Sequence, residues 1–140
     1  MVDAAAVVLW RDAGAGIELF IAQRSPKLRF LGGWFAFPGG VVDDADRAGS
    51  GDDDRTMRAC AVRELHEELG VVASIGPIFE VIAHRYPEFD LLMLVYSCTF
   101  DREPVAKEVA QVRWVDPADL PNFPILPADA PLVARLAAAG

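Results

Sequence analysis

The stretch Arg63-Glu64-Leu65-His66-Glu67-Glu68-Leu69-Gly70-Val71 decides the fold, because it combines a face to bury with a charged face in a short segment. On a helix of 3.6 residues per turn, Glu64 lies one turn before Glu67 and Glu68, so the three carboxylates share one face. The opposite side carries an apolar stripe with a spacing of four, formed by Ala61, Leu65 and Leu69. Because Gly70 stands where a helix commonly ends, the sequence predicts a helix with one buried and one acidic face.

The acidic face predicts a site for a divalent cation. Three carboxylates on one face repel one another unless a cation lies among them, and hard oxygen ligands of this kind suit Mg²⁺ or Mn²⁺. The alternative is a solvated charged face on which Arg63 pairs with Glu67 at i,i+4. The acids do not alternate with basic residues, which favours the cation site and leaves the solvated face open.

The same stretch resembles the Nudix box, G-x5-E-x7-R-E-U-x-E-E-x-G-U, in which U is a bulky aliphatic residue. Every defined position from the arginine onward is met, by Arg63, Glu64, Leu65, Glu67, Glu68, Gly70 and Val71. Phe37-Pro38-Gly39-Gly40 stands where the box of this family begins, and Arg113-Trp114-Val115-Asp116 extends the resemblance toward the end of the chain. The likeness therefore covers nearly the whole chain, and the box is its most specific part.

The chain departs from the box in one place, between its glycine and its arginine. The segment from Gly40 to Arg63 is about nine residues longer than in the family, so the first glutamate of the box has no obvious equivalent. Counting forward from Gly40 leads to Asp46, and counting back from Arg63 leads to Arg55. Asp54 is a further candidate, as a local cap of the helix. The insertion affects the loop before the helix more than it affects the cation site.

Apolar runs alternate with polar turns along the chain, which indicates an α/β fold. Strands are expected at residues 4–10, 17–23, 34–37, 41–42, 71–83 (with a turn at Gly76-Pro77), 91–100 and 108–115. Helices are expected at residues 55–69, 118–120 and 129–139. The order predicts a mixed sheet covered on both faces. By resemblance, this is a Nudix-type α/β/α sandwich with a central mixed sheet and a loop–helix–loop box, in a single domain over residues 1–140.

Resemblance to the Nudix family implies a pyrophosphohydrolase that cleaves a nucleoside diphosphate linked to another moiety, with Mg²⁺ or Mn²⁺ as cofactor. The negative diphosphate oxygens resist attack by water, and a divalent cation neutralises their charge and lowers the pKa of a bound water. By the same resemblance, the metal ligands are Glu64, Glu67, Glu68 and the backbone carbonyl of Gly40. Arg63 then orients the carboxylates through a charge-assisted pair.

The general base differs among Nudix enzymes, in which it is either a glutamate of the box or one from a distant loop. Within the box, the catalytic candidates are Glu64 and Glu67, together with Arg63. In the loop before the last strand, they are Glu103 and Glu108, and Glu108 is preferred because it stands next to that strand. An exposed glutamate at the start of a strand is the alternative for Glu108.

Residues 24–40 resemble the segment that precedes the box in the coenzyme A diphosphatases of this family. The shared positions are Arg24, Ser25, Leu28, Arg29, Gly33, Ala36 and the Phe-Pro-Gly-Gly run. Arg24 and Arg29 would then contact the 3′-phosphate of coenzyme A, and Arg85 would reach a phosphate or a base. Coenzyme A or an acyl derivative is therefore the leading substrate, and ADP-ribose, dinucleoside polyphosphates and modified nucleotides remain open.

Composition narrows the partners to a small molecule. A net charge of −8 argues against a broad phosphate-contacting surface for nucleic acid, and the apolar runs are too short to span a bilayer. The start of the chain, Met1-Val2-Asp3-Ala4-Ala5, lacks the basic residues of a secretory signal, which favours a cytoplasmic protein. Cys60 and Cys98 lack CxxC spacing, which disfavours a disulfide or a zinc site. Members of the family are often dimers, so a homodimer stays open.

Two interpretations from other classes compete with the enzyme. One is a catalytically weak Nudix-like module that binds a nucleotide, which only the missing first glutamate supports. The other is a structural acidic helix in an unrelated α/β domain, which the match to the box disfavours.

Overall fold

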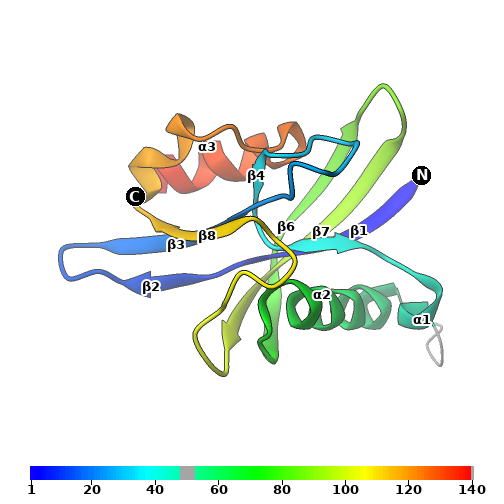
Figure 1. Ribbon diagram of the computed structural model, residues 1–140, viewed down its shortest axis with the longest axis horizontal. Coiled ribbons are helices and arrows are strands. Elements are labelled where there is room, and N and C mark those ends of the chain that lie inside the picture. The colour runs from blue at the N-terminus through cyan, green and yellow to red at the C-terminus, as the bar shows by residue number, and fades with distance from the viewer. Residues whose placement is uncertain (48–52, 140) are drawn as a thin grey trace.

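Two strands with long apolar runs lie side by side at the centre of a sheet, β1 (Val2–Val8) and β7 (Asp90–Phe100), and they pair in parallel (Figure 1). Antiparallel strands flank them: β5 (Gly39–Val41) beside β1, and β6 (Ala73–Arg85) beside β7. This sheet is mixed, as the sequence predicts. The structure, a computed structural model, describes residues 1–47 and 53–139.

A second sheet, which is entirely antiparallel, is built around β3 (Ile17–Gln23). The short strands β2 (Trp10–Asp12) and β4 (Phe35–Ala36) lie along one side of β3, and β8 (Gln111–Val115) lies along the other. Gly14, with a φ of 83°, allows the tight turn between β2 and β3. The sequence predicts most of these strands, but their division into two sheets depends on long-range pairing that periodicity does not reveal.

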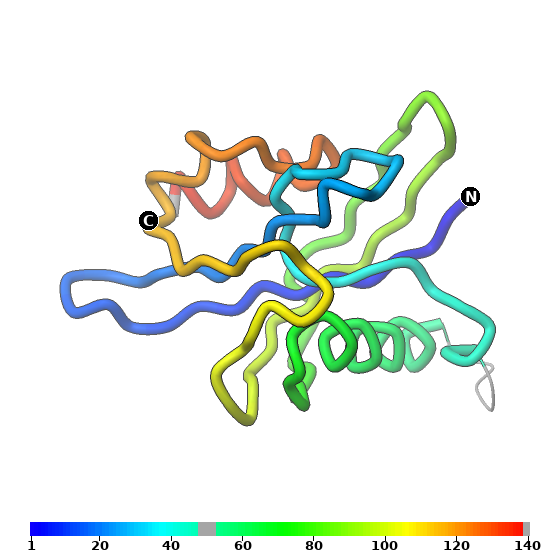
Figure 2. Tube along the Cα trace, in the orientation of Figure 1, coloured from blue at the N-terminus to red at the C-terminus, as the bar shows by residue number. Residues whose placement is uncertain are grey.

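Two helices cover the mixed sheet from opposite sides, α2 (Asp53–Leu69) and α3 (Ala130–Ala139) (Figure 1). The described residues also form three short helical turns: α1 (Asp44–Arg47), η1 (Pro117–Asn122) and η2 (Pro127–Asp129). The predicted α/β/α sandwich is therefore confirmed. Figure 2 shows the loop of residues 24–34 lying between α3 and the β6–β7 hairpin. No helix in the described part of the chain is long and apolar enough to cross a membrane.

Helix α2 buries the apolar stripe that the sequence predicts. Its fully buried residues are Cys60, Ala61, Leu65 and Leu69, which pack with Ala5 and Val7 of β1 and with Tyr96 of β7. Burying one leucine contributes roughly 1.5–3 kcal/mol, so the stripe fixes the helix firmly to the sheet. The helix ends at Gly70, whose φ is 69° and whose N–H donates to the His66 carbonyl at 3.0 Å.

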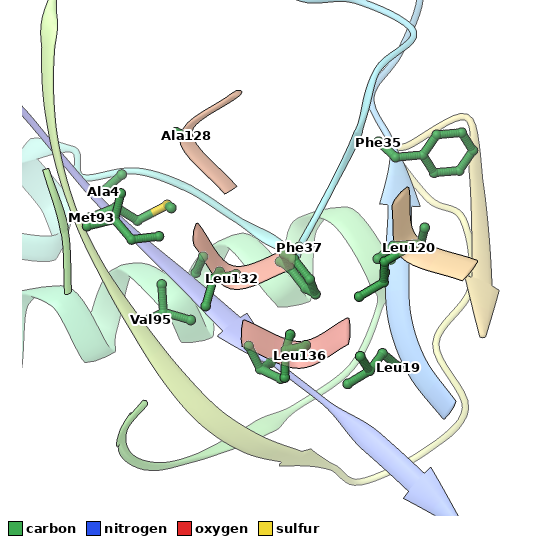
Figure 3. Close-up of a cluster of buried hydrophobic side chains, with 14 of the residues drawn as sticks. Ala4, Leu19, Phe35, Phe37, Met93, Val95, Leu120, Ala128, Leu132 and Leu136 are labelled. Atoms are coloured by element: carbon green, nitrogen blue, oxygen red, sulfur yellow. The ribbon is translucent and has the colours of Figure 1, made fainter. Parts of the chain in front are cut away.

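The other core lies between the sheets and α3 (Figure 3). Leu132 and Leu136 of α3 belong to one buried cluster with Leu19 of β3, Val95 of β7 and Phe37. Phe37 immediately precedes Pro38-Gly39-Gly40, so this core also holds the Phe-Pro-Gly-Gly run against the sheet.

The expected turn at Gly76-Pro77 does not divide β6. The strand absorbs these residues as a bulge, with shifts of register between Ile75 and Ile78 and between Ile78 and Glu80. The Ser97 hydroxyl donates to the Pro77 carbonyl at 3.3 Å. Because β6 lies at the edge of the sheet, a proline without an N–H removes no hydrogen bond to another strand.

The last strand begins at Gln111 rather than at Glu108 as predicted. The backbone N–H groups of Lys107 and Glu108 donate to the Glu68 carbonyl, at 3.0 and 3.2 Å, and so cap the end of α2 instead of joining the sheet. The expected polar loop after residue 42 also contains a helical turn, α1.

Candidate active site

Two glycines bring β5 into direct contact with its neighbours. A Cβ at Gly39, whose φ is 154°, would collide with the Ala5 carbonyl, and a Cβ at Gly40 would collide with the carboxylate of Glu64. The Gly40 carbonyl accepts a hydrogen bond from the Cys60 thiol at 3.4 Å. The Phe-Pro-Gly-Gly run therefore lies directly against the acidic side of α2, and glycine is required at Gly39, where β5 closely approaches the backbone of β1.

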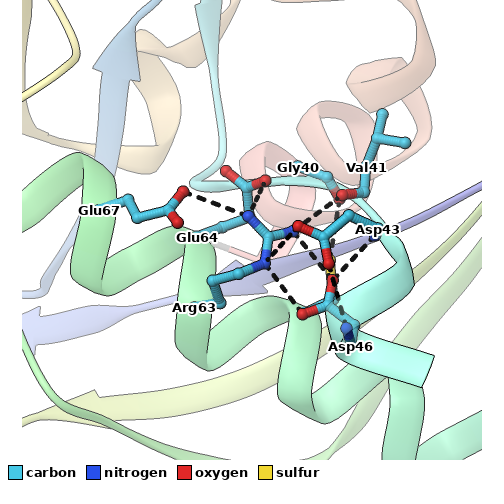
Figure 4. Close-up of polar contacts among 8 residues, drawn as sticks. Gly40, Val41, Asp43, Asp46, Arg63, Glu64 and Glu67 are labelled. Carbon is cyan, nitrogen blue, oxygen red and sulfur yellow. Dashed lines mark hydrogen bonds and ion pairs between the residues drawn. The ribbon is translucent and has the colours of Figure 1, made fainter. Parts of the chain in front are cut away.

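Arg63 is the centre of a polar network beside Glu64 (Figure 4). Its Nε and Nη2 atoms form a bidentate pair with Asp46, each at 2.9 Å. Its Nη1 atom lies 3.0 Å from Glu64 Oε1 and 3.2 Å from Glu67 Oε2, and Nη2 also donates to the Val41 carbonyl at 3.1 Å. The hydrogen bonds to Asp46 raise the pKa of the guanidinium further. Arg63 thus ties the acidic face to the segment that follows β5.

Asp46 occupies the place of the first glutamate of the box. Only 3% of its side chain is exposed, and the hydrogen bonds from Arg63 lower the pKa of its carboxyl. Asp43 and Asp46 also exchange two backbone-to-carboxylate hydrogen bonds, at 3.0 and 3.1 Å, which fix α1. An acid that pairs with Arg63 therefore stands six residues after Gly40, which is the spacing of the first glutamate in the box, and the additional residues follow it in the sequence.

Asp54 and Arg55, the other candidates for the first acid of the box, make contacts of a different kind. Asp54 accepts the Tyr96 hydroxyl at 2.7 Å and pairs with Arg58 at 2.8 Å, so it anchors the start of α2 to the sheet. Arg55 lies in the first turn of α2 and carries the wrong charge to hold Arg63.

Glu64 and Glu68 are partly buried next to each other on α2 and share a hydrogen bond. Burial and the neighbouring Glu64 charge raise the pKa of Glu68 to about 8, and burial also raises the pKa of Glu64. Two neighbouring carboxylates that are partly removed from water repel each other when both are ionised, and a divalent cation between them would relieve that repulsion. Glu68 Oε1 is buried without a hydrogen-bond partner among the described residues, which fits an oxygen that can serve as a ligand to a cation.

Glu67 is the most exposed of the three acids, with 46% of its side chain accessible. It pairs with Arg63 at i,i+4, so the ion pair of the alternative interpretation exists alongside the acidic face. Within the described ranges, no three acidic, histidine or cysteine side chains are already gathered as a metal cluster. Glu64, Glu67 and Glu68 could hold a divalent cation once Glu67 turns from Arg63 toward the other two.

The structure separates the two loop glutamates. The capping bonds from Lys107 and Glu108 to the Glu68 carbonyl place Glu108 at the end of α2, and its charge contributes to the raised pKa of Glu68. Glu103 instead is 77% exposed and lies 3.9 Å from Arg11, which belongs to β2. Only Glu108 is brought to the acidic face.

A cavity of about 140 Å³ lies on the other side of the Phe-Pro-Gly-Gly run. It is mostly apolar, and its lining includes Ala4, Ala6, Arg24, Phe30, Ala36, Phe37, Gly39, Gly40, Tyr86, Phe89, Met93, Ala128 and Asp129. Gly40 is shared between the cavity and the acidic face, because its Cα lies against Glu64. The two parts of the site therefore adjoin.

Three aromatic rings form one wall of the cavity. Phe30 comes from the loop of residues 24–34, and its ring centroid lies 4.9 Å from that of Tyr86 and 5.2 Å from that of Phe89. Tyr86 and Phe89 flank the turn of the β6–β7 hairpin, and their ring centroids are 5.3 Å apart. A flat aromatic ligand could pack against such a surface.

Asp129 is the buried acid of the cavity, with 2% of its surface exposed. One carboxylate oxygen accepts the Phe37 N–H at 3.3 Å, and burial raises the pKa of the carboxyl to about 7. Sequence reasoning missed its role, since an aspartate ahead of an alanine- and leucine-rich segment reads as the start of the last helix. In the sequence, the only sign that Asp129 is buried at the cavity is its position between Pro127 and that apolar helix.

The three arginines predicted to bind substrate lie in different environments. Arg24 lines the cavity and donates from Nη2 to the Phe30 carbonyl at 3.0 Å. Arg29 is exposed on the same loop. Arg85 pairs with Asp90 at 2.9 Å and has 85% of its side chain exposed, so the structure does not bring it to the cavity.

The fold and the site together define a class: an α/β/α sandwich in which a carboxylate-rich helix adjoins a small cavity. The chain belongs to the Nudix family, because the NUDIX domain matches residues 1–136. Its function is therefore the hydrolysis of a diphosphate linkage in a nucleotide derivative, a reaction for which the family generally uses divalent metal ions.

Two relatives and one solved structure illustrate the range of similarity. CTP pyrophosphohydrolase of Escherichia coli is 28% identical over 95% of this chain and 89% of its own length. The peroxisomal coenzyme A diphosphatase ndx-8 of Caenorhabditis elegans is 36% identical over 49% of this chain and 27% of its own length. The solution structure of the E. coli ORF135 protein has a TM-score of 0.75 and 26% identity, over 99% of this chain and 89% of that one.

Proposed function

We propose that this chain hydrolyses a nucleotide derivative whose base enters the cavity and whose diphosphate lies along the acidic face of α2. The observation that carries the proposal is the position of Gly40, which lines the cavity and also lies against Glu64. A substrate with its base in the cavity would extend its phosphates past this glycine toward Glu64, Glu67 and Glu68.

The acidic face would hold Mg²⁺ or Mn²⁺, with Glu64, Glu67, Glu68 and the Gly40 carbonyl as ligands. Such an ion neutralises phosphate charge and lowers the pKa of water. Arg63 would act by positioning, because it forms ion pairs with Glu64 and Glu67. Glu108 is the proposed general base, since its loop places it next to Glu68.

The cavity suits a heteroaromatic base better than a flexible chain. Phe30, Tyr86 and Phe89 supply aromatic surface, and Asp129 supplies a polar group that can hydrogen-bond to a base edge. Likeness to CTP pyrophosphohydrolase over most of both chains supports a nucleoside triphosphate as substrate. We therefore place nucleoside triphosphates, including modified ones, ahead of the other candidates.

Coenzyme A or an acyl derivative is the second candidate, and two observations favour it. Residues 24–40 resemble the coenzyme A diphosphatases, and ndx-8 is similar to about half of this chain. Coenzyme A also carries an adenine that the cavity could accept. Arg24 points inward to the cavity and the Phe30 carbonyl, however, which leaves the exposed Arg29 to meet a 3′-phosphate. ADP-ribose and dinucleoside polyphosphates come after these.

A catalytically weak binding module loses its main support. It rested on a missing first acid in the box, whereas Asp46 forms the bidentate pair with Arg63.

The test is a hydrolysis screen with Mg²⁺ or Mn²⁺ over the four common nucleoside triphosphates, oxidised nucleotides, coenzyme A, ADP-ribose and a dinucleoside polyphosphate. The products are separated by chromatography, because cleavage of a diphosphate linkage in these compounds gives pyrophosphate, nucleotides or other phosphomonoesters. Glu67→Gln is assayed beside the intact protein, with Glu88→Gln at an exposed turn as the matched control. We expect a nucleoside triphosphate to be the best substrate, and we expect Glu67→Gln, but not Glu88→Gln, to lower turnover by about 10²-fold. Absence of turnover with every compound would contradict the proposed activity, and full turnover by Glu67→Gln would contradict the proposed site.

A further inference from the structure

The cavity beside the Phe-Pro-Gly-Gly run is lined mostly by apolar groups. Among the described residues that line it, the polar side chains are those of Arg24, Tyr86 and Asp129. In an apolar pocket, a few polar groups decide which ligand is accepted. Tyr86 supplies the only hydroxyl among these described residues, so the hydrogen bonds of that hydroxyl bear directly on substrate selection.

The ring of Tyr86 is fixed inside the cavity. The backbone N–H of Tyr86 donates to the Phe89 carbonyl at 2.9 Å, at the turn of the β6–β7 hairpin. The ring centroid lies 4.9 Å from that of Phe30 and 4.5 Å from that of His84. Only 7% of the residue is exposed, so its ring is held in the interior rather than turned toward solvent.

The hydroxyl of Tyr86 uses only one side of its hydrogen-bonding capacity. Its oxygen accepts the Ala128 N–H at 3.0 Å, whereas a phenolic hydroxyl can donate as well as accept. Among the described residues, this hydroxyl donates to no acceptor. Burial raises the pKa of Tyr86, so the proton stays on the oxygen at neutral pH. The cavity therefore contains a buried donor that a ligand could pair.

The same hydroxyl lies close to the acid of the cavity. The Ala128 N–H that it accepts belongs to the residue directly before Asp129, whose carboxylate accepts the Phe37 N–H at 3.3 Å. These two bonds hold a hydroxyl donor and a carboxylate at neighbouring positions of the cavity wall. The edges of nucleobases present donors and acceptors side by side, so a base that reaches Asp129 would also meet the Tyr86 hydroxyl.

We propose that Tyr86 is a specificity-determining residue, whose hydroxyl donates a hydrogen bond to an acceptor atom of the bound base, either a ring nitrogen or a carbonyl oxygen. The inference rests on the proposed function for the presence of a base in the cavity, and it adds a requirement on that base. A ligand with a C–H group at the contacted position leaves the buried hydroxyl unpaired. Sites built to hydrogen-bond a substrate group reject analogues that lack it for this reason.

Binding of nucleoside monophosphates tests this role without turnover, because these compounds contain no diphosphate linkage. Calorimetry first identifies the base whose monophosphate binds most tightly. It then compares that compound with analogues in which one acceptor at a time is replaced, by C–H for a ring nitrogen or by sulfur for a carbonyl oxygen. The variants are Tyr86→Phe and, as the matched control, Tyr96→Phe, which removes the other tyrosine hydroxyl of the chain, outside the cavity lining. The penalty for each replaced atom in each protein forms a double-mutant cycle.

For the intact protein we expect one replacement to weaken binding about tenfold. In Tyr86→Phe, the unmodified monophosphate should bind about tenfold more weakly, and the penalty for that replacement should fall to within about twofold. Tyr96→Phe should keep the full penalty. Each variant loses a hydrogen bond, to Ala128 or to Asp54, so a lower unfolding temperature is expected of both and does not distinguish them.

A penalty that persists in Tyr86→Phe would overturn the proposal. So would an equal loss of affinity for the monophosphate and its analogue, which would leave Tyr86 only a structural partner of Ala128. The absence of any penalised replacement, or of measurable binding by the intact protein, would overturn it as well.

These outcomes are separable from those of the hydrolysis screen. Efficient turnover with no coupling between Tyr86 and the base would refute the role of Tyr86 alone. Coupling in the binding measurements would stand even if no compound in the screen were turned over, which would refute the proposed activity alone.

Discussion

The acidic face of α2 and the cavity beside it are built in opposite ways. The acidic face comes from Glu64, Glu67 and Glu68, which one helix presents within five consecutive positions. The cavity is assembled from β1, the loop of residues 24–34, the β6–β7 hairpin and the segment before α3. The first is determined by local spacing, and the second only by the packing of the whole chain.

This difference suggests a division of labour within the site. The acidic face of α2, which depends on local spacing alone, can keep the same diphosphate chemistry. The cavity residues come from separate segments, and changes in them can alter which ligand enters the cavity. The account therefore assigns bond cleavage to the acidic face and substrate selection to the cavity.

The largest effect is expected from Glu68→Gln, which breaks the acidic face and leaves the cavity intact. We expect kcat to fall by about 10²–10³-fold on every substrate, because a proposed metal ligand is lost. The unfolding temperature should stay the same or rise, since a buried acid whose pKa is raised to about 8 is replaced by a neutral group. Kinetics and thermal unfolding, with Glu88→Gln as control, check both parts, and a parallel loss of stability would contradict them.

Asp46→Asn tests whether the acidic face depends on the loop before α2. The bidentate pair with Arg63 is lost, and we expect the free energy of unfolding to fall by about 1–3 kcal/mol and kcat/KM to fall about tenfold. Denaturant unfolding and steady-state kinetics measure these changes. Asp44→Asn, at an exposed position of the same short helix, should leave both values unchanged. Unaltered kinetics in Asp46→Asn would remove Asp46 from the site.

Periodicity accounts for what the sequence could predict. Helix α2, its buried stripe and its acids follow from spacing within one segment, as do β3 and β7. The position of Asp46 was also within reach, by counting forward from Gly40, but the bidentate pair with Arg63 depends on the fold of α1. The local sequence pattern was sufficient to predict a feature wherever the interacting residues belong to one helix or strand.

The remaining parts of the site depend on contacts between distant segments. Asp129 reads as a helix start, and only the fold shows that it is buried next to Phe37, 92 residues earlier in the chain. Arg85 reads as a candidate phosphate ligand, but strand alternation turns Tyr86 toward the cavity and Arg85 toward Asp90. The bulge at Gly76-Pro77 likewise depends on the partner strand β7.

The pH dependence of stability tests the buried acid of the cavity. The pKa of Asp129 is raised from 3.8 to about 7 in the folded state, so its protonated form is stabilised there relative to the unfolded chain. Its contribution is therefore fully present below pH 3.8 and is lost as the pH rises through about 7, by at most roughly 1.4 kcal/mol per pH unit.

Asp129→Asn should remove this slope, because an asparagine does not titrate. The measurement is the difference in unfolding free energy between the intact protein and Asp129→Asn from pH 4 to pH 8. Taking the difference cancels the contribution of Glu68, which titrates in an overlapping range. A difference that does not vary with pH would show that Asp129 is ionised throughout.

The smallest effect is expected from Arg85→Gln, which tests where the substrate-binding cavity ends. Because its side chain is 85% exposed and pairs with Asp90, Arg85→Gln should change KM for any substrate by less than about twofold. Steady-state kinetics over the substrates found in the screen provide the check. A large rise in KM would mean that the bound substrate extends beyond the β6–β7 hairpin.

The most direct test of the division of labour is the ranking of kcat/KM over a set of substrates in Glu68→Gln and Asp129→Asn. The account predicts that Glu68→Gln lowers every value by a similar factor and keeps the ranking. It predicts that Asp129→Asn changes the ranking, with some bases gaining relative to others. A changed ranking in Glu68→Gln, or a uniform loss in Asp129→Asn, would contradict the assignment of chemistry to the helix and selection to the cavity.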